Sequence, residues 1–74
     1  MNINGEEALK AIGNRVRELR ISAGHSSHEE FADIHGFQRK QIWRLESGQD
    51  FKISTLIRLA DIHKITLEEF FKGL

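Results

Sequence analysis

The segment from Phe31 to Glu46 reads FADIHGFQRKQIWRLE and decides the fold. Ala32 is followed by Gly36 four positions later and by Ile42 six positions after that. The spacing suits two short helices that cross over a tight turn. A small residue lets the helices approach, glycine can adopt the positive φ of the turn, and a β-branched residue fills the crossing point. The segment therefore predicts a helix-turn-helix unit over about residues 27–47.

The second helix of this unit, expected over residues 38–47, turns a polar and cationic face away from Ile42 and Leu45. A guanidinium group can bind guanine O6 and N7 together, an amide can pair with adenine, and an ammonium group suits phosphate. The candidates for contacts with base edges are Gln38, Arg39, Lys40 and Arg44. Gln38 has an alternative role as the cap of the helix, and Lys40 suits a phosphate better than a base. This face predicts a helix that enters the major groove of duplex DNA.

Trp43 is the only tryptophan of the chain, and its position leaves two interpretations open. Because it directly follows Ile42, it lies off the apolar face of the helix. It could contact the sugar-phosphate backbone, a thymine methyl group or a partner surface. The preferred interpretation is that it packs over the first helix as a peripheral core residue.

Composition indicates one small, mainly helical domain covering residues 1–74. The chain has 74 residues, 39% of them hydrophobic and 30% charged, with no proline and no cysteine. A core of this size is near the lower limit for independent folding, and the sequence has neither disulfides nor a zinc-ligand spacing to reinforce it. We expect no metal and no cofactor, and stability that comes from helix packing with help from oligomerisation.

The same sequence disfavours several classes of protein. No basic-then-apolar signal pattern opens the chain, and no apolar run approaches the roughly 20 residues of a membrane span. No Ser/His/acid, paired-carboxylate or phosphate-loop arrangement is present, and a small helical domain leaves little room for a substrate pocket. These patterns predict a cytoplasmic protein that is neither an enzyme nor a membrane protein.

Charge is balanced over the whole chain but polarised within the predicted unit. The formal net charge is zero, from 11 basic and 11 acidic side chains. Residues 21–37 carry three acids and no Lys or Arg, whereas residues 38–44 carry three cations and no acid. The local field therefore favours an anion at the second helix. The neutral total predicts weak non-specific affinity for DNA and dependence on a dimer.

Caps and apolar periodicity predict five helices. Capping patterns occur at Asn4 with Glu7, at Ser27 with Glu30 and at Thr66 with Glu69. The first expected helix starts near Asn4 and stops at Gly24, and the second runs from Ser26 or Ser27 to His35. The third covers residues 38–47 and ends before Gly48. The fourth follows Ser54 as its N-cap, and the fifth starts at Thr66. The fold class predicted from this pattern is all-α.

Matched segments occur in order along most of the chain, from about Ile12 to Phe71. They are IGNRVRELR at 12–20, EEFA at 29–32, the turn glycine at 36, IWRLESG at 42–48, LIRLA at 56–60 and TLEEFF at 66–71. In these segments the sequence resembles the Cro/repressor-type helix-turn-helix family, also called xenobiotic-response-element-like. The resemblance implies the five-helix lambda-repressor-like fold and a sequence-specific regulator of transcription, expected to be a repressor that binds a double-stranded DNA operator.

The resemblance also assigns roles to individual positions. Phosphate or positioning contacts fall on Ser27, His28, Ser47 and Gly48, where His28 departs from the glutamine common in the family. Trp43 is a further candidate for such a contact through its place on the helix, not through the resemblance. Arg20 and Glu46 match a pair that forms a structural salt bridge.

In many relatives the last helix joins two copies of the chain. Phe71 and Leu74 are therefore the candidates for a homodimer contact. The alternative function is an antitoxin-type or other protein-interaction module that uses the same fold and binds a protein partner.

Overall fold

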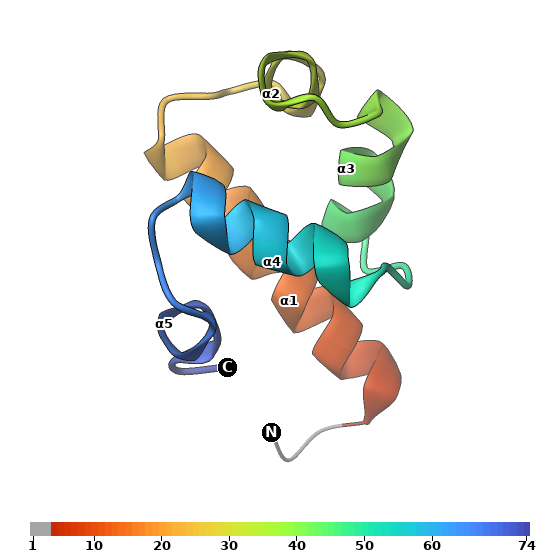
Figure 1. Cartoon of the computed structure of the whole chain (residues 1–74). Helices are drawn as coiled ribbons and strands as arrows, with labels where there is room; N and C mark the ends of the chain where they lie inside the picture. The colour runs from red at the N-terminus through yellow and green to blue at the C-terminus, as the bar shows by residue number, and fades with distance from the viewer. Residues whose placement is uncertain (1–3) are drawn as a thin grey trace.

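Five α-helices make up the computed structural model, which describes residues 4–74 (Figure 1). The helices are α1 (Gly5–Ser22), α2 (His28–His35), α3 (Arg39–Glu46), α4 (Ile53–Ile62) and α5 (Leu67–Phe71). No strand occurs in the described range, so the all-α prediction is confirmed. Within residues 4–74, no helix combines the length and the apolar character that crossing a membrane requires.

The reciprocal capping predicted from sequence is complete at one of its three places. At Thr66, the Glu69 N–H donates to Thr66 Oγ1 and the Thr66 N–H donates to Glu69 Oε1, each at 3.0 Å. At Asn4, the side chain accepts the Glu7 N–H at 2.8 Å, but the Glu7 carboxylate bonds the Asn4 side-chain amide instead of its backbone. The α1 cap is therefore an Asn cap without the reciprocal backbone bond.

Ser27 caps α2, as its sequence position predicts. Its Oγ accepts the N–H groups of Glu29 and Glu30 at 3.2 and 3.3 Å. The Glu30 carboxylate does not return to Ser27, because it lies 3.5 Å from His25 Nδ1. The acid of this capping pattern is thus directed to the loop before the helix.

The predicted start of α4 is wrong by two residues, because Lys52 rather than Ser54 occupies the N-cap position. Lys52 makes no side-chain cap hydrogen bond. The first turn is stabilised instead by hydrogen bonds of Thr55. Thr55 is buried, its N–H donates to the Lys52 carbonyl at 2.9 Å, and its hydroxyl accepts a hydrogen bond from Gln41 of α3 at 3.1 Å. Contact with α3 therefore sets the start of α4.

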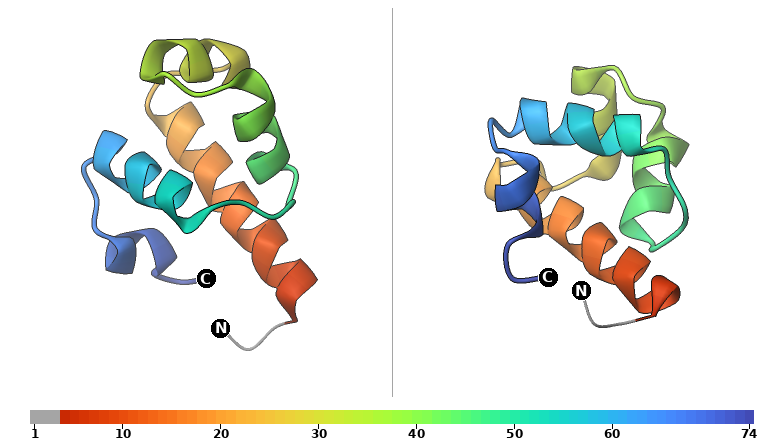
Figure 2. Two further views of the ribbon diagram at one scale, coloured as in Figure 1. Left: turned by 45° about the vertical axis from the view of Figure 1, so that its right-hand side comes forward. Right: turned by 60° about the horizontal axis from the view of Figure 1, so that its bottom comes forward.

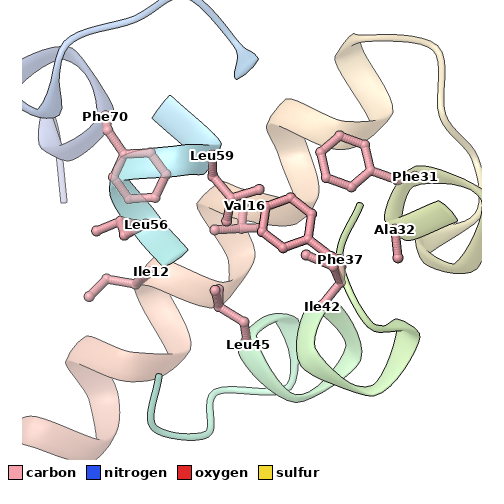
Figure 3. Packing of buried hydrophobic residues seen from close by; sticks show 10 residues of the cluster. All are labelled: Ile12, Val16, Phe31, Ala32, Phe37, Ile42, Leu45, Leu56, Leu59 and Phe70. Atoms are coloured by element: carbon pink, nitrogen blue, oxygen red, sulfur yellow. The ribbon is translucent and has the colours of Figure 1, made fainter. Parts of the chain in front are cut away.

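The core lies where α1 is covered by α3 on one side and by α4 and α5 on another (Figure 2). The spacing that predicted a crossing holds in detail: Ala32 and Ile42 are fully buried, and Gly36 has φ +76°. The Phe37 N–H donates to the Ala32 carbonyl at 2.9 Å and closes the turn between α2 and α3. Figure 3 shows the cluster, which consists of Ile12, Val16, Phe31, Ala32, Phe37, Ile42, Leu45, Leu56, Leu59 and Phe70.

Helices α1 and α3 approach closely because Gly13 lies between them. A Cβ atom on Gly13 would lie 2.5 Å from the Leu45 carbonyl oxygen and 2.9 Å from that of Glu46. Both atoms belong to the backbone, so no rotamer change could relieve the clash. This contact fixes how α3 sits on α1 and therefore which face of α3 remains exposed.

Candidate functional site

Helix α3 has one face in the core and one face in solvent, as its 3.6-residue period requires. Ile42 and Leu45 are at most 1% exposed and pack toward α1 and α2. The exposed side chains of the helix are Arg39, Lys40, Trp43 and Arg44. Four of the residues predicted to contact DNA are therefore presented together on one surface.

A hollow of about 510 Å³ lies between α3 and the segment leading into α4. It is lined by Gly36, Gln38, Lys40, Gln41, Arg44, Asp50, Phe51, Lys52 and Thr55. Three of these side chains are cations and one is an acid, so the hollow suits an anion. Gln38, Lys40 and Arg44, all predicted from sequence, meet here.

Two smaller hollows, of about 290 and 360 Å³, lie along the α2 and α1 side of α3. His28 and Trp43 line both of them. The remaining lining residues are Glu29, Arg39 and Lys40 in one, and Arg17, Arg20, Ser26, Glu46 and Ser47 in the other. The exposed face of α3 is thus a ridge with a concave surface on each side.

The guanidinium of Arg39 does not project freely into solvent. Its Nε and Nη2 donate to the two carboxylate oxygens of Asp33 at 3.3 and 2.8 Å, and its Nη1 donates to Glu29 at 3.4 Å. The hydrogen bond from Arg39 lowers the pKa of Asp33, and the same bond raises the pKa of Arg39. The opposite charges of α2 and α3 are evident in the sequence, but their direct contact is not.

The preferred interpretation of Trp43, packing as a peripheral core residue, is wrong. The residue is 49% exposed and lies outside the buried cluster. Its neighbours Ile42 and Leu45 already occupy the face of α3 that meets the core. The indole therefore remains on the surface between two of the hollows, where it is available to a ligand.

The prediction that the side chain of Gln38 caps α3 is also wrong, although the residue occupies the N-cap position. Gln38 occupies the N-cap position of α3 with extended backbone, yet its side chain makes no cap hydrogen bond. The exposed amide lines the hollow beside Lys40 and Arg44. Its hydrogen-bonding groups are available to an external ligand.

The three small residues expected near phosphates are all engaged in helix caps. Ser27 accepts two N–H groups of α2, as described above. The Ser47 hydroxyl donates to the Trp43 carbonyl at 2.7 Å. The Gly48 N–H donates to the Leu45 carbonyl at 3.1 Å, and the φ of Gly48 is +86°. A phosphate contact through the Gly48 amide would require this cap bond to break.

The salt bridge expected between Arg20 and Glu46 is present. Arg20 Nε and Nη2 donate to the two Glu46 oxygens at 2.8 and 3.0 Å, and Arg20 Nη1 donates to the His25 carbonyl at 2.8 Å. The Arg20 and Glu46 side chains are only 6% and 10% exposed. The pair joins α1 to the last turn of α3 directly beneath one of the hollows.

Phe71 and Leu74, the candidates for a dimer contact, are half-buried against the core of their own chain. The ring of Phe71 meets that of the buried Phe70 edge-on, with centroids 5.1 Å apart. Part of the apolar area expected to meet a second copy is therefore already covered. The larger exposed apolar side chains on α4 are Ile53 and Ile57, at 61% and 43% exposed.

Three histidines surround Phe31 away from the α3 surface. The rings of His25, His35 and His63 lie 5.4, 4.6 and 5.7 Å from the Phe31 ring. Burial lowers the pKa of His63, and the proximity of His35 and His25 lowers it further. Within residues 4–74, no group of three or more potential ligands has an arrangement that could hold a metal ion.

Several residues that line the hollows were not predicted from the sequence. Arg17 lies on α1 three positions before Arg20, a spacing that places both on one side of that helix. Gln41 could not be distinguished in the sequence from the other polar residues of α3, and Lys52 belonged to a segment interpreted as a loop. The helical spacing of Arg17 and Arg20 was available in the sequence. The positions of Gln41 and Lys52 depend on how α4 packs.

Comparisons with protein-family models, with curated proteins and with solved structures find no match to this chain.

Proposed function

We propose that this chain is a sequence-specific, double-stranded-DNA-binding regulator of transcription that places α3 in the major groove. One observation carries the proposal: α3 presents a ridge of Arg39, Lys40, Trp43 and Arg44 with a concave surface on each side. The major groove is about 12 Å wide and accepts one α-helix. The side chains on the ridge are those that match base edges and phosphates.

The hollows beside α3 suit the two phosphate chains that border the groove. Lys40, Arg44 and Lys52 supply positive charge on one side, and His28 and Arg17 line the other. Contacts of this kind fix the register of the protein on DNA, whereas contacts with base edges supply specificity. The proposal thus gives both surfaces a role.

The proposed arrangement is that of a helix-turn-helix within a lambda-repressor-like fold. Its support is the close packing of α2 on α3 through Ala32 and Ile42 and the positive φ of Gly36 between them. In such units the first helix crosses the DNA backbone and the second lies in the groove. Here these helices are α2 and α3.

We further propose that the protein binds DNA as a homodimer and represses by competing with polymerase for overlapping sites. A chain with zero net charge has little general attraction for DNA, so a second copy would raise affinity. A two-fold dimer would place its two α3 helices about 34 Å apart on successive turns of one DNA face. Phe71 and Leu74 are the proposed contact.

The test is selection of bound sequences from a library of random duplex DNA. We expect an enriched motif with two palindromic half-sites. Arg44→Ala should weaken binding to that motif by roughly tenfold or more, since a good base contact is worth about 1–3 kcal/mol. Lys64→Gln, which removes an exposed cation just beyond α4 and outside the proposed DNA and dimer surfaces, is the matched control. Recovery of unenriched sequence by the wild-type protein would refute the proposal.

A second candidate function is a protein-interaction module. The observation that favours it is the exposure of Ile53 and Ile57, one turn apart on α4. Paired substitution of both by Ser would weaken a protein complex while leaving the α3 surface intact. If DNA binding is unchanged in that variant, the two functions use separate surfaces.

A further inference from the structure

The most unusual feature of the α3 surface is that its leading arginine is held by two acids of the preceding helix. Asp33 lies in the last turns of α2, and Arg39 is the first residue of α3, across the Gly36 turn. The side chains of Asp33 and Arg39 are 55% and 60% exposed, so the pair is on the surface. The pair therefore contributes little to the stability of the protein. Its more important effect is to fix the orientation of the Arg39 side chain.

Asp33 and Glu29 differ in how they bind the guanidinium. Asp33 engages it in a bidentate manner, through Nε at 3.3 Å and Nη2 at 2.8 Å. Glu29 reaches only Nη1, at 3.4 Å. Asp33 also directly follows Ala32, which is fully buried, so its backbone position is fixed by the core. Asp33 is the stronger and better anchored of the two partners.

The bidentate contact leaves a defined part of the guanidinium free. A guanidinium has five N–H donors in a planar fork. Asp33 uses the edge formed by Nε and Nη2, which leaves the terminal edge formed by Nη1 and Nη2 with one N–H on each nitrogen that is not directed at Asp33. Two parallel N–H groups are what guanine O6 and N7 accept. Only the looser Glu29 contact competes at this terminal edge.

We propose that Asp33 is a positioning residue for DNA recognition: it holds Arg39 so that the terminal Nη1–Nη2 edge is presented to a guanine in the major groove. The inference rests on the proposed function and deepens it by naming a specificity determinant on α2. A long arginine side chain that is held in place loses less freedom when it binds, so preorganisation strengthens the correct contact. Asp33 itself does not contact the base.

The same carboxylates reduce binding to unrelated DNA. Asp33 and Glu29 lie beside Arg39 and oppose its attraction for phosphate, which is the interaction that all DNA sequences share. The pKa of Asp33 lies below its usual value, because Arg39 donates to it, so its charge is present at neutral pH. Asp33 therefore raises the ratio of specific to non-specific binding in two ways: it strengthens the contact with guanine, and it weakens the attraction for phosphate.

The experiment compares wild type, Asp33→Asn, Arg39→Ala and the double variant. The wild-type protein first selects a motif from random duplex DNA, and the base pair read by Arg39 is the one whose identity ceases to matter in Arg39→Ala. Dissociation constants are then measured for the motif with guanine or another base at that position. A duplex of unrelated sequence, titrated over a range of salt concentrations, reports non-specific binding.

We expect Asp33→Asn to reduce discrimination at that base pair by roughly tenfold, within the range that one bidentate contact supplies. Non-specific affinity should rise, with a salt dependence steeper by up to about one ion. In the Arg39→Ala background, Asp33→Asn should cause no further loss of discrimination, since the arginine it positions is absent. Melting temperatures establish that all variants fold.

Asp61→Asn is the matched control, because it removes an exposed carboxylate from the end of α4 that lies away from α3 (Figure 1). It should leave the base preference unchanged. Unchanged discrimination in Asp33→Asn, or an Arg39→Ala protein with the wild-type base preference, would overturn the inference and leave the proposed function standing. A wild-type protein that selects no motif would overturn both.

Discussion

Arg20 of α1 and Glu46 of α3 form a bidentate ion pair, with N–O distances of 2.8 and 3.0 Å, in a position almost closed to solvent. The third nitrogen of the guanidinium, Nη1, binds the His25 carbonyl at 2.8 Å. Each side-chain nitrogen of Arg20 thus donates one hydrogen bond, and one side chain connects α1, the following loop and the end of α3. The pair fixes α3 from below while leaving its outer face free.

Replacement of Glu46 by Ala should destabilise the protein by roughly 3–5 kcal/mol, because it leaves the Arg20 charge buried without its partner. Urea unfolding at neutral pH measures this loss. The double variant Arg20→Met, Glu46→Leu should recover most of the stability, since apolar residues of similar volume remove both buried charges. A loss below about 1 kcal/mol for Glu46→Ala, typical of an exposed pair, would contradict the buried geometry.

Gly13→Ala should destabilise the protein by about 1–3 kcal/mol, although alanine is the better helix former. The new Cβ would meet the backbone oxygens of Leu45 and Glu46 and push α3 away from α1. Gly5→Ala is the matched control in the same helix, because a Cβ there has no atom within 4 Å. Thermal unfolding of both variants provides the measurement. Equal melting temperatures would mean that α3 can shift at little cost.

The fold was predictable wherever local chemistry determined it. The Ala32, Gly36 and Ile42 spacing and the Thr66 cap depend on neighbours in sequence, and both predictions hold. The start of α4 was not predictable in the same way. Ser54 is the better cap by type, but the Gln41–Thr55 bond and the burial of Thr55 set the first turn.

In the candidate site, too, local features were predictable from the sequence and contacts between helices were not. Residue type and helical period identified the exposed face of α3, but not the carboxylates that bind Arg39 across a turn. Such a contact depends on the angle between two helices, and the sequence pattern alone does not contain that angle. The predicted packing of Trp43 is wrong because Ile42 and Leu45 already fill the core face of α3 and leave the indole 49% exposed.

Trp43 should report DNA binding directly through its fluorescence. It is the only tryptophan and is 49% exposed beside the proposed recognition residues. Addition of the selected duplex should shift its emission to shorter wavelength or quench it, because the indole would exchange water for DNA. The signal should saturate at the stoichiometry found by gel shift. If tight binding occurs without any change in emission, α3 is not the face that meets DNA.

Stability should fall as pH decreases from about 7.5 to 5.5, and His63 should account for part of the fall. Burial beside His35 and His25 lowers the pKa of His63 below 6.5. The unfolded chain therefore binds a proton at a higher pH than the folded chain does. Since stability rises with pH wherever the unfolded state binds more protons, the contribution is complete above pH 6.5 and is lost as pH falls toward the folded pKa.

The comparison of wild type with His63→Gln isolates this contribution. The variant should lose fewer degrees of melting temperature between pH 7.5 and 5.5, because a neutral amide replaces the titrating ring. Asp33 does not interfere, since its pKa is lowered from 3.8 and its effect is lost only at more acidic pH. Titration of the His63 ring protons by NMR supplies the direct measurement. A midpoint at or above 6.5 would contradict the effect of burial beside Phe31 and the two other histidines.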